Sequence, residues 1–327
     1  MNPELRNLPI DTFFSGRKVL VTGASGFIGS PLTAELVRIG AQVTAVTRGG
    51  QGSGSGHVRW VEGNLEDLTI TREIINQEKP ELVFHMAAHA WGSQDLSLVA
   101  ATFYGCLATT VNVLIATAET GCSRIVLPGS LEEPLELGGT PNSPYSAAKF
   151  ASNMYGKMFH KLYGMEVVQT RIFMTYGPGQ DCRKVIPFFI TSLLCRAPLC
   201  VQSPDRIIDW IYIDDVVSGI LAASSGSQMS DHPVEIGSGI GVSIGEVAEK
   251  LCRMLDTDSS MIFDEMPRRV EEIVRVADAD ATYLRTGWRA KIPLEVGLLR
   301  TIEWYKEKFQ ANPGEKTLTS NGISSRK

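Results

Sequence analysis

The sequence predicts an α/β protein in which a doubly wound parallel sheet is joined to a smaller C-terminal lobe. Short apolar runs typical of strands alternate with segments of helical periodicity through the first half of the chain. A glycine-rich turn stands between the first of these strands and the helix that follows it. The length of 327 residues is long for one simple domain and short for three, which favours two closely joined lobes.

The first strand, helix and second strand lie in RKVLVTGASGFIGSPLTAELVRIGAQVTAVTR, residues 17–48. An apolar run at 19–21 meets a G-x-x-G-x-x-G turn, and a second apolar run follows the helix at 41–46. Glycines let the backbone turn tightly and approach a pyrophosphate, whose charge is favoured at a helix N-terminus. The segment therefore predicts dinucleotide binding at Gly23, Ser25, Gly26, Phe27, Ile28 and Gly29.

The remaining elements continue the alternation. Further strands are predicted in HVRWVEGNL, ELVFHMAA, RIVLPGS and MEVVQTRIF, with helices near 67–78, 95–120 and 144–163. Ligands of a doubly wound sheet lie beyond the carboxyl ends of its strands. Because Ser130 follows the strand RIVLPG, we expect it to face the same crevice as the glycine turn.

The helix near 144–163 begins and ends with clear signals. Ser143 can accept a backbone N–H as N-cap, Pro144 suits the first helical position, and Gly164 ends the helix. Tyr145 and Lys149 are four residues apart and share one face. An ammonium beside a phenol favours the ionised form and lowers the phenol pKa, so this pair is a candidate for proton transfer.

Composition argues against several classes of protein. Hydrophobic residues make up 43%, charged residues 20% and the net charge is −5, which suits a soluble enzyme and offers no basic field for nucleic acid. The six cysteines show no CxxC pair and no Cys/His cluster with zinc spacing, so we expect reduced thiols and no metal. No apolar run is expected to span a membrane and the N-terminus lacks the plan of a signal peptide, which predicts a cytoplasmic protein.

Several motifs together resemble a known family. TGASGFIG, GNL, HMAA, Ser130 with YSAAK, and YGPGQ resemble in order and spacing the extended short-chain dehydrogenase/reductases, which include nucleotide-sugar epimerases, dehydratases and ketoreductases. The likeness continues through DWIYIDDVV, VEIGSG and GWRAKIPLEVGLLRTIEWY, so it covers roughly residues 17–308. The resemblance implies a Rossmann fold, NADP or NAD as cofactor, and a nucleotide-sugar substrate. It also implies a homodimer through the helices near 95–120 and 144–163.

The resemblance implies a role for each matching residue. Tyr145 would be the acid/base, Lys149 would bind the nicotinamide ribose and lower the pKa of Tyr145, and Ser130 would hydrogen-bond a sugar hydroxyl or carbonyl. His89 and Trp91 would border the sugar or the nicotinamide. Other cofactor contacts would come from Asn64, Leu65, Ala87, Ala88, Ile172 and Phe173.

The end of the second predicted strand departs from the family. It reads Thr47-Arg48, where NAD-using members commonly place an acidic residue on the adenine ribose. Without a carboxylate to repel it a 2′-phosphate is tolerable, and Arg48 can bind that phosphate with its planar fork. The alternative is that Arg48 is a solvated loop residue. We therefore expect NADP to be preferred over NAD.

Other departures concern the substrate. Met174 stands before YGPGQ where the family usually brings an Asn to the sugar, and Cys106 occupies a helical position often held by Asn. The "RD" whose Arg grips a substrate phosphate in many relatives reads Ile208-Asp209 here. Three other basic residues could bind the substrate phosphate instead: Arg206, Arg268 and Arg269. Each of them could equally be a solvent-exposed charge without a ligand.

Glu132 bears on the type of reaction. Sugar-nucleotide 4,6-dehydratases of this family carry a Glu two residues beyond the hydroxyl residue, used at C5, and Ser130-Leu131-Glu132 preserves that spacing. Some also use an Asp between the two, where this chain has Leu131. A loop carboxylate without a catalytic role is the alternative.

The leading interpretation is an NADPH-dependent 4-ketoreductase acting at C4 of a nucleotide sugar. A C4-epimerase with tightly bound NAD, a 4,6-dehydratase, a small-carbonyl reductase and a non-catalytic redox sensor remain alternatives. We expect residues 1–170 to form the dinucleotide-binding domain, with 208–238 returning to it, and 171–207 with 239–311 to form the substrate-binding lobe. The stretch 49–56 and the tail 312–327 are predicted to be flexible.

Overall fold

The computed structural model describes residues 9–49, 57–135, 138–201, 203–226, 232–257, 262–263 and 273–311. The predicted flexible tail, nearly all of the stretch 49–56, and the candidates Arg268 and Arg269 lie outside the described residues. Contacts between residues divide the chain into two compact units. The first comprises Met1–Ile172, Val216–Ile236 and Asp278–Arg289, and the second comprises Phe173–Asp215, Gly237–Ala277 and Ala290–Lys327.

The described part of the first unit contains a seven-stranded parallel sheet with the order β10-β6-β5-β4-β1-β2-β3. Its strands are β1 (Lys18–Thr22), β2 (Gln42–Thr47), β3 (Val58–Glu62), β4 (Leu82–His85), β5 (Arg124–Ser130), β6 (Glu166–Ile172) and β10 (Val234–Ile236). The strand order reverses between β1 and β4, which is where ligands bind in open α/β sheets. The predicted doubly wound parallel sheet is confirmed.

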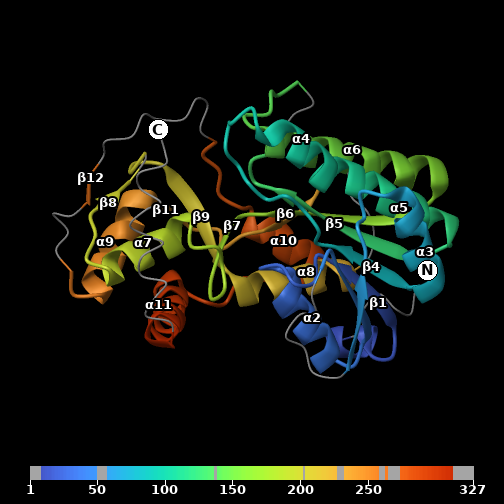
Figure 1. The fold of residues 1–327 in the computed structure, drawn as a ribbon, viewed down its shortest axis with the longest axis horizontal. Coiled ribbons are helices and arrows are strands. Elements are labelled where there is room, and N and C mark those ends of the chain that lie inside the picture. Colours follow the sequence, from blue (N-terminus) through green and yellow to red (C-terminus); the bar gives the residue numbers. More distant parts are fainter. Residues whose placement is uncertain are drawn as a thin grey trace. The chain divides into compact units, whose positions relative to one another are not determined.

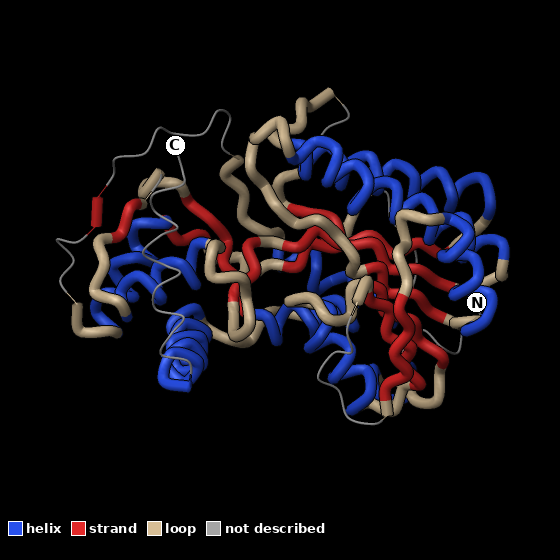
Figure 2. Tube along the Cα trace, in the orientation of Figure 1, coloured by secondary structure: helices blue, strands red, loops and turns tan. Residues whose placement is uncertain are grey.

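Helices cover both faces of this sheet, with α5 and α6 on one face and α2 and α8 on the other (Figure 1). Figure 2 shows the strands as a layer between the helices. The helices are α1 (Ile10–Phe14), α2 (Gly29–Arg38), α3 (Leu68–Glu78), α4 (Leu98–Thr102), a π-helical turn η2 (Phe103–Ala108), α5 (Thr109–Glu119), α6 (Pro144–Tyr163), α8 (Ile213–Ser225) and α10 (Ala279–Thr286).

The ends of α6 are those predicted. The Ser143 hydroxyl accepts the N–H of Ser146 at 3.1 Å, Pro144 stands in the first turn, and Gly164 ends the helix in the left-handed region at φ 66°. Tyr145 therefore lies in the first turn and Lys149 one turn later.

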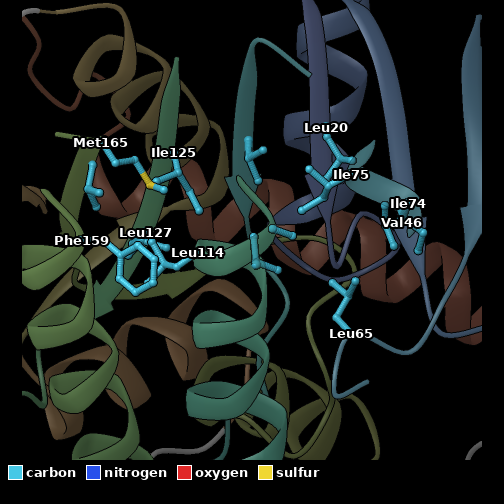
Figure 3. Close-up of a cluster of buried hydrophobic side chains, with 14 residues drawn as sticks. Leu20, Val46, Leu65, Ile74, Ile75, Leu114, Ile125, Leu127, Phe159 and Met165 are labelled. Atoms are coloured by element: carbon cyan, nitrogen blue, oxygen red, sulfur yellow. The ribbon is translucent and has the colours of Figure 1, made fainter. Parts of the chain in front are cut away.

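The core of the first unit lies between the sheet and its helices. Leu114 of α5 and Phe159 of α6 are buried with Leu127 of β5, and Leu20 of β1 is buried with Ile75 of α3 (Figure 3). Burying such apolar side chains is the main force that holds helices onto a sheet. This packing fixes where the carboxyl end of each strand stands relative to the helix that follows it.

One helical run bears on the expectation that no segment spans a membrane. The continuous helical run Leu98–Glu119 has 22 residues and a mean hydropathy of 1.8, long and apolar enough by composition to cross a membrane. A core helix of an α/β layer meets the same criterion, and Val113, Leu114 and Ala116 of this run lie in the hydrophobic core.

The second unit has smaller sheets. Strands β7 (Met174–Tyr176), β9 (Ile207–Tyr212) and β11 (Gly241–Ser243) form one sheet, and β8 (Leu199–Cys200) pairs with β12 (Ile262–Phe263). Its helices are α7 (Val185–Leu194), α9 (Ile244–Met254) and α11 (Leu294–Ala311). The buried Asp209 carboxylate accepts backbone N–H groups of Ser238, Gly239 and Ala277 at 2.7 to 3.0 Å, which joins three segments of this unit.

The division by contacts differs most from the predicted domain bounds at residues 208–215 and 278–289. Residues 208–215 belong to the second unit because β9 pairs with β7 and β11, whereas the return to the large sheet begins within α8 and continues in β10. Residues 278–289 belong to the first unit, where the Trp288 indole N–H donates to Ser218 Oγ at 2.8 Å.

Candidate active site

The turn after β1 leaves no room for side chains at two of its glycines. A Cβ at Gly29 would lie 2.1 Å from the Gly23 carbonyl oxygen. A Cβ at Gly23, whose φ is +61°, would lie 2.7 Å from the backbone of Ala87. The turn therefore packs directly on the segment after β4, and α2 begins at Gly29 with its N–H groups beside it. Such a turn lets a pyrophosphate approach the backbone.

The segment after β4 is joined to this turn through buried hydroxyls. Thr22 Oγ1 accepts the N–H of Ala87 at 3.1 Å and lies 2.8 Å from His85 Nδ1. His85 Nε2 lies 3.2 Å from Thr110 Oγ1. Burial, helped by the charge of Lys149, lowers the pKa of His85 to about 3, so this imidazole is neutral. His85 therefore has a structural role, because it bonds to the same Thr22 hydroxyl that accepts the N–H of Ala87.

The predicted adenine-side residues lie at the ends of β2 and β3. Leu65 is a core residue, and its carbonyl accepts the side-chain N–H of Asn112 at 2.9 Å. Asn64 Oδ1 accepts the N–H of Glu66 at 3.2 Å, and Thr47 is buried. Backbone and small polar groups therefore line this end of the crevice.

Arg48 lies among acidic side chains. Its side chain is 71% exposed, and its Nη1 stands 4.0 Å from Glu66 Oε1. A Cβ at Gly49 would lie 4.0 Å from Glu62 Oε1, so a second carboxylate is close. The end of β2 therefore offers one cation and two anions to whatever binds there.

Ser130 and Tyr145 meet at the carboxyl end of β5. The Ser130 hydroxyl is hydrogen-bonded to the Tyr145 phenol and also accepts the N–H of Glu132 at 3.2 Å. Burial holds the pKa of Tyr145 well above its usual range, and Cys106, Glu132 and Glu133 act in the same direction. The phenol is thus protonated and able to donate.

Lys149 contacts this group differently from the prediction. Its ammonium donates to the Pro128 carbonyl at 2.9 Å, and its charge acts on His85, Cys106 and Glu133. Burial raises the pKa of Tyr145, so a lowering of that pKa by Lys149 stays a prediction. Helical spacing alone does not fix where a long side chain ends.

Glu132 is held against the start of α6. Its backbone carbonyl accepts the Ser146 hydroxyl at 2.7 Å, and its Oε2 lies 3.5 Å from the Ser143 hydroxyl. A Cβ at Gly92 would lie 2.9 Å from both carboxylate oxygens, so the loop after β4 passes close to them. The structure therefore brings Glu132 together with Ser130 and Tyr145.

The predicted substrate residues divide between the two units. In the first, Trp91 is partly buried, and the N–H of His89 donates to Cys106 Sγ at 3.3 Å. In the second, Met174 opens β7, and Arg206 donates from Nη2 to the Ile273 carbonyl at 3.2 Å. Ile172 ends β6 and Phe173 follows it, both buried.

Sequence reasoning missed one buried carboxylate in this site. Glu133 is 3% exposed and accepts the N–H of Ser130 at 2.6 Å and the Asn153 side-chain N–H at 2.5 Å. A charged residue beside Pro134 carries no sequence signal for burial, because its partners come from β5 and α6. Within the described ranges, no three His, Cys, Asp or Glu side chains gather as metal ligands would.

Comparison with known proteins places this geometry in context. Residues 19–237 match the model of the NAD-dependent epimerase/dehydratase family. A probable dTDP-glucose 4,6-dehydratase of Sinorhizobium fredii is 28% identical, over 89% of this chain and 93% of the relative. The dTDP-D-glucose 4,6-dehydratase of Mus musculus is 26% identical, over 94% of this chain and 93% of the relative.

Solved structures have the same fold. A dTDP-glucose 4,6-dehydratase of Streptomyces venezuelae, solved with NAD bound, is similar with a TM-score of 0.81 and 25% identity, covering 90% of this chain and 98% of that one. A UDP-glucose 4-epimerase of Thermotoga maritima, solved with UDP-glucose, is similar with a TM-score of 0.79 and 25% identity, covering 89% of this chain and 99% of that one.

Proposed function

Because the chain belongs to the NAD-dependent epimerase/dehydratase family, we propose that it is a nucleotide-sugar 4,6-dehydratase with tightly bound NAD. The observation that carries this proposal is the Glu132 carboxylate beside the hydrogen-bonded pair of Ser130 and Tyr145. Relatives named as dTDP-glucose 4,6-dehydratases over nearly the whole chain support it.

The residues after β1 and β4 fit a dinucleotide. The spaces that a Cβ would fill at Gly23 and Gly29 admit backbone but no side chain, as close approach to a pyrophosphate requires. Lys149 can hold the nicotinamide ribose. A dinucleotide held there would supply the hydride chemistry, as acceptor for C4 of the sugar and as donor for C6.

Tyr145 and Ser130 handle the proton at C4. Ser130 hydrogen-bonds the C4 hydroxyl, and the ionised form of Tyr145 accepts the proton of that hydroxyl as the carbon is oxidised. The raised pKa of Tyr145 makes its phenolate a strong base toward the proton of the C4 hydroxyl. The ketone left at C4 acidifies the hydrogen at C5.

Glu132 handles the elimination. As a carboxylate it takes the C5 proton, and as the resulting acid it gives a proton to the C6 hydroxyl, so that the C6–O bond breaks and water leaves. A double bond then joins C5 and C6. As hydride is added at C6, Glu132 delivers to C5 a proton that it has taken from solvent. Leu131 is buried and cannot assist, so Glu132 acts alone.

Two other activities remain as second candidates. A C4-epimerase would use Ser130, Tyr145 and Lys149 without Glu132, and the similar UDP-glucose 4-epimerase supports it. The 4-ketoreductase favoured by the sequence depended on Arg48 binding a 2′-phosphate. Glu62 and Glu66 stand at the same end of β2 and would repel that phosphate, so we favour NAD over NADP.

We also propose a homodimer formed through one face of the first unit. Helices α4, η2 and α6 pack on one another and expose the large apolar side chains Val99, Phe103, Tyr104, Tyr155, Leu162 and Tyr163. An apolar surface of this kind marks an interaction site. Sedimentation of wild type and of Phe103→Glu would test it, since the substitution should produce monomers.

The test of the reaction uses dTDP-glucose and UDP-glucose in deuterated water. We expect wild type to form a 4-keto-6-deoxy sugar with deuterium at C5. Glu132→Gln should stop this product while the reduced cofactor still accumulates, and Glu73→Gln, an exposed carboxylate on α3, should behave as wild type. A C4-inverted sugar without deuterium at C5 would instead identify an epimerase.

A further inference from the structure

We propose that Glu133 is a positioning residue that ties Ser130 to helix α6 and whose negative charge acts on the Tyr145 phenol. Nothing in the reaction requires Glu133 to touch the substrate, because its carboxylate points into the protein. The inference rests on the proposed function only where turnover is measured.

The hydrogen bonds of Glu133 join the strand end to the catalytic helix. One carboxylate oxygen accepts the Ser130 N–H at 2.6 Å and the other accepts the Asn153 side-chain N–H at 2.5 Å. Asn153 lies one turn after Lys149 on α6, and its backbone carbonyl accepts the Gln169 side chain at 2.6 Å. The position of Ser130 relative to Tyr145 therefore depends on Glu133.

The space for this pair is provided by Gly129. A Cβ there would lie 2.5 Å from Glu133 Oε1 and 2.7 Å from Asn153 Nδ2. A side chain at residue 129 would thus expel the carboxylate. The site is built around a buried acid, and its two oxygens both accept hydrogen bonds, as suits an ionised carboxylate.

Several charges face the Tyr145 phenol and its neighbours. Glu132 and Glu133 come from the segment after β5, Cys106 from η2, Lys149 from α6, Arg171 from β6, and the neutral His85 from β4. Burial raises the pKa of Glu133, while Lys149 and Arg171 favour its charged form. An ionised Glu133 disfavours the phenolate, so it makes the ionised Tyr145 a stronger base for the proton of the C4 hydroxyl.

The test exchanges the acid and the amide of the pair. Glu133→Gln removes the charge, Asn153→Asp places two carboxylates in contact, and Glu133→Gln with Asn153→Asp restores one charge and one amide in reversed order. We expect Asn153→Asp to lower the thermal midpoint most and the double substitution to recover most of that loss. This coupling is measured without any substrate.

A second measurement separates the effect of the Glu133 charge from a disturbance of the packing around it. With tyrosine labelled with carbon-13 at Cζ and Tyr145→Phe used for assignment, Glu133→Gln should lower the Tyr145 titration midpoint by about one pH unit, the scale on which one nearby charge acts. The double substitution should return it towards wild type. The pH at which C4 oxidation depends on ionised Tyr145 should fall by the same amount as the titration midpoint. Glu235→Gln is the control, because Glu235 pairs with Arg171, whose charge acts on Glu133, and the Glu235 side chain bonds to Arg171 and to the Asp278 N–H.

The outcomes separate the two proposals. If Glu133→Gln leaves both the Tyr145 resonance and the pH profile unchanged, or if the double substitution recovers nothing, the inference about Glu133 is overturned. If wild type forms no dehydrated sugar while the resonance still moves as expected, the proposed function fails and the inference about Glu133 stands.

Discussion

The carboxyl ends of β5 and β2 belong to one sheet but hold their polar side chains in different ways. After β5, Ser130, Glu132 and Glu133 each bond to backbone or to α6. After β2, Arg48 extends into solvent with its acidic neighbour 4.0 Å away. The first end is preorganised by buried hydrogen bonds, and the second is set by exposed charges that solvent screens.

This difference indicates which property each end controls. A proton-transfer site needs groups fixed to a fraction of an ångström, which buried bonds supply. Selection between NAD and NADP needs only a favourable or unfavourable charge near the ribose. The β5 end should therefore respond strongly and non-additively to substitution, and the β2 end weakly.

The largest effect should come from Tyr145→Phe at the β5 end. Turnover should fall by about two to four orders of magnitude, the usual contribution of a positioned proton-transfer group. Thermal stability and dinucleotide binding should stay close to wild type, because the hydrogen bond that is lost is the one between the phenol and the Ser130 side chain. Steady-state kinetics with a parallel cofactor titration would check this. Undiminished turnover would remove Tyr145 from the mechanism.

An intermediate effect is expected from His85, which lies between the two ends on β4. Its folded-state pKa, about 3, lies below the unfolded value near 6.5. The folded state therefore binds fewer protons than the unfolded state in this window, and stability is present above pH 6.5 and lost as the pH falls towards 3. The slope should reach about 1.4 kcal/mol per pH unit.

His85→Gln should flatten this part of the profile, since an amide can bond to Thr22 and Thr110 without titrating. Urea unfolding of both proteins across that pH range is the measurement. Parallel profiles for the two proteins would mean that other groups govern the acid loss of stability.

The smallest effect should come from Arg48→Ala at the β2 end. Affinity for NAD should change by less than about fivefold, since an exposed ion pair contributes about 0 to 1 kcal/mol. Calorimetric titration with NAD and NADP would measure it. A large and selective loss of NADP affinity would restore the preference for NADP that the sequence favoured.

Sequence predicted the elements of the first unit because their signals are local. Ser143, Pro144 and Gly164 mark the ends of α6, and the spacing of three glycines marks the turn after β1. The grouping of Ser130, Tyr145 and Lys149 also followed, since strand ends and helix starts meet at one edge of a parallel sheet.

Tertiary contacts decided what sequence did not predict. Glu133 can be buried because Gly129 leaves space for its carboxylate and because the Asn153 side chain donates a hydrogen bond to it. The raised pKa of Tyr145 comes from burial and from the neighbouring Cys106, Glu132 and Glu133, which no spacing within α6 predicts. The place of β9 in the second unit follows from its pairing with β7 and β11, which no periodicity reveals.

The π-helical turn η2 sets the rotational phase of α4 relative to α5. Wider turns of this kind arise where a helix holds one extra residue, and each residue of an α-helix turns the chain by about 100°. Deleting one residue within Phe103–Ala108 would let the run form a regular α-helix. Val99 on α4 would then be rotated relative to α5, away from the side of the helix on which Tyr104 is exposed. Loss of this one residue would leave the hydropathy of the helix almost unchanged. The apolar face of α4, however, would no longer align with α6.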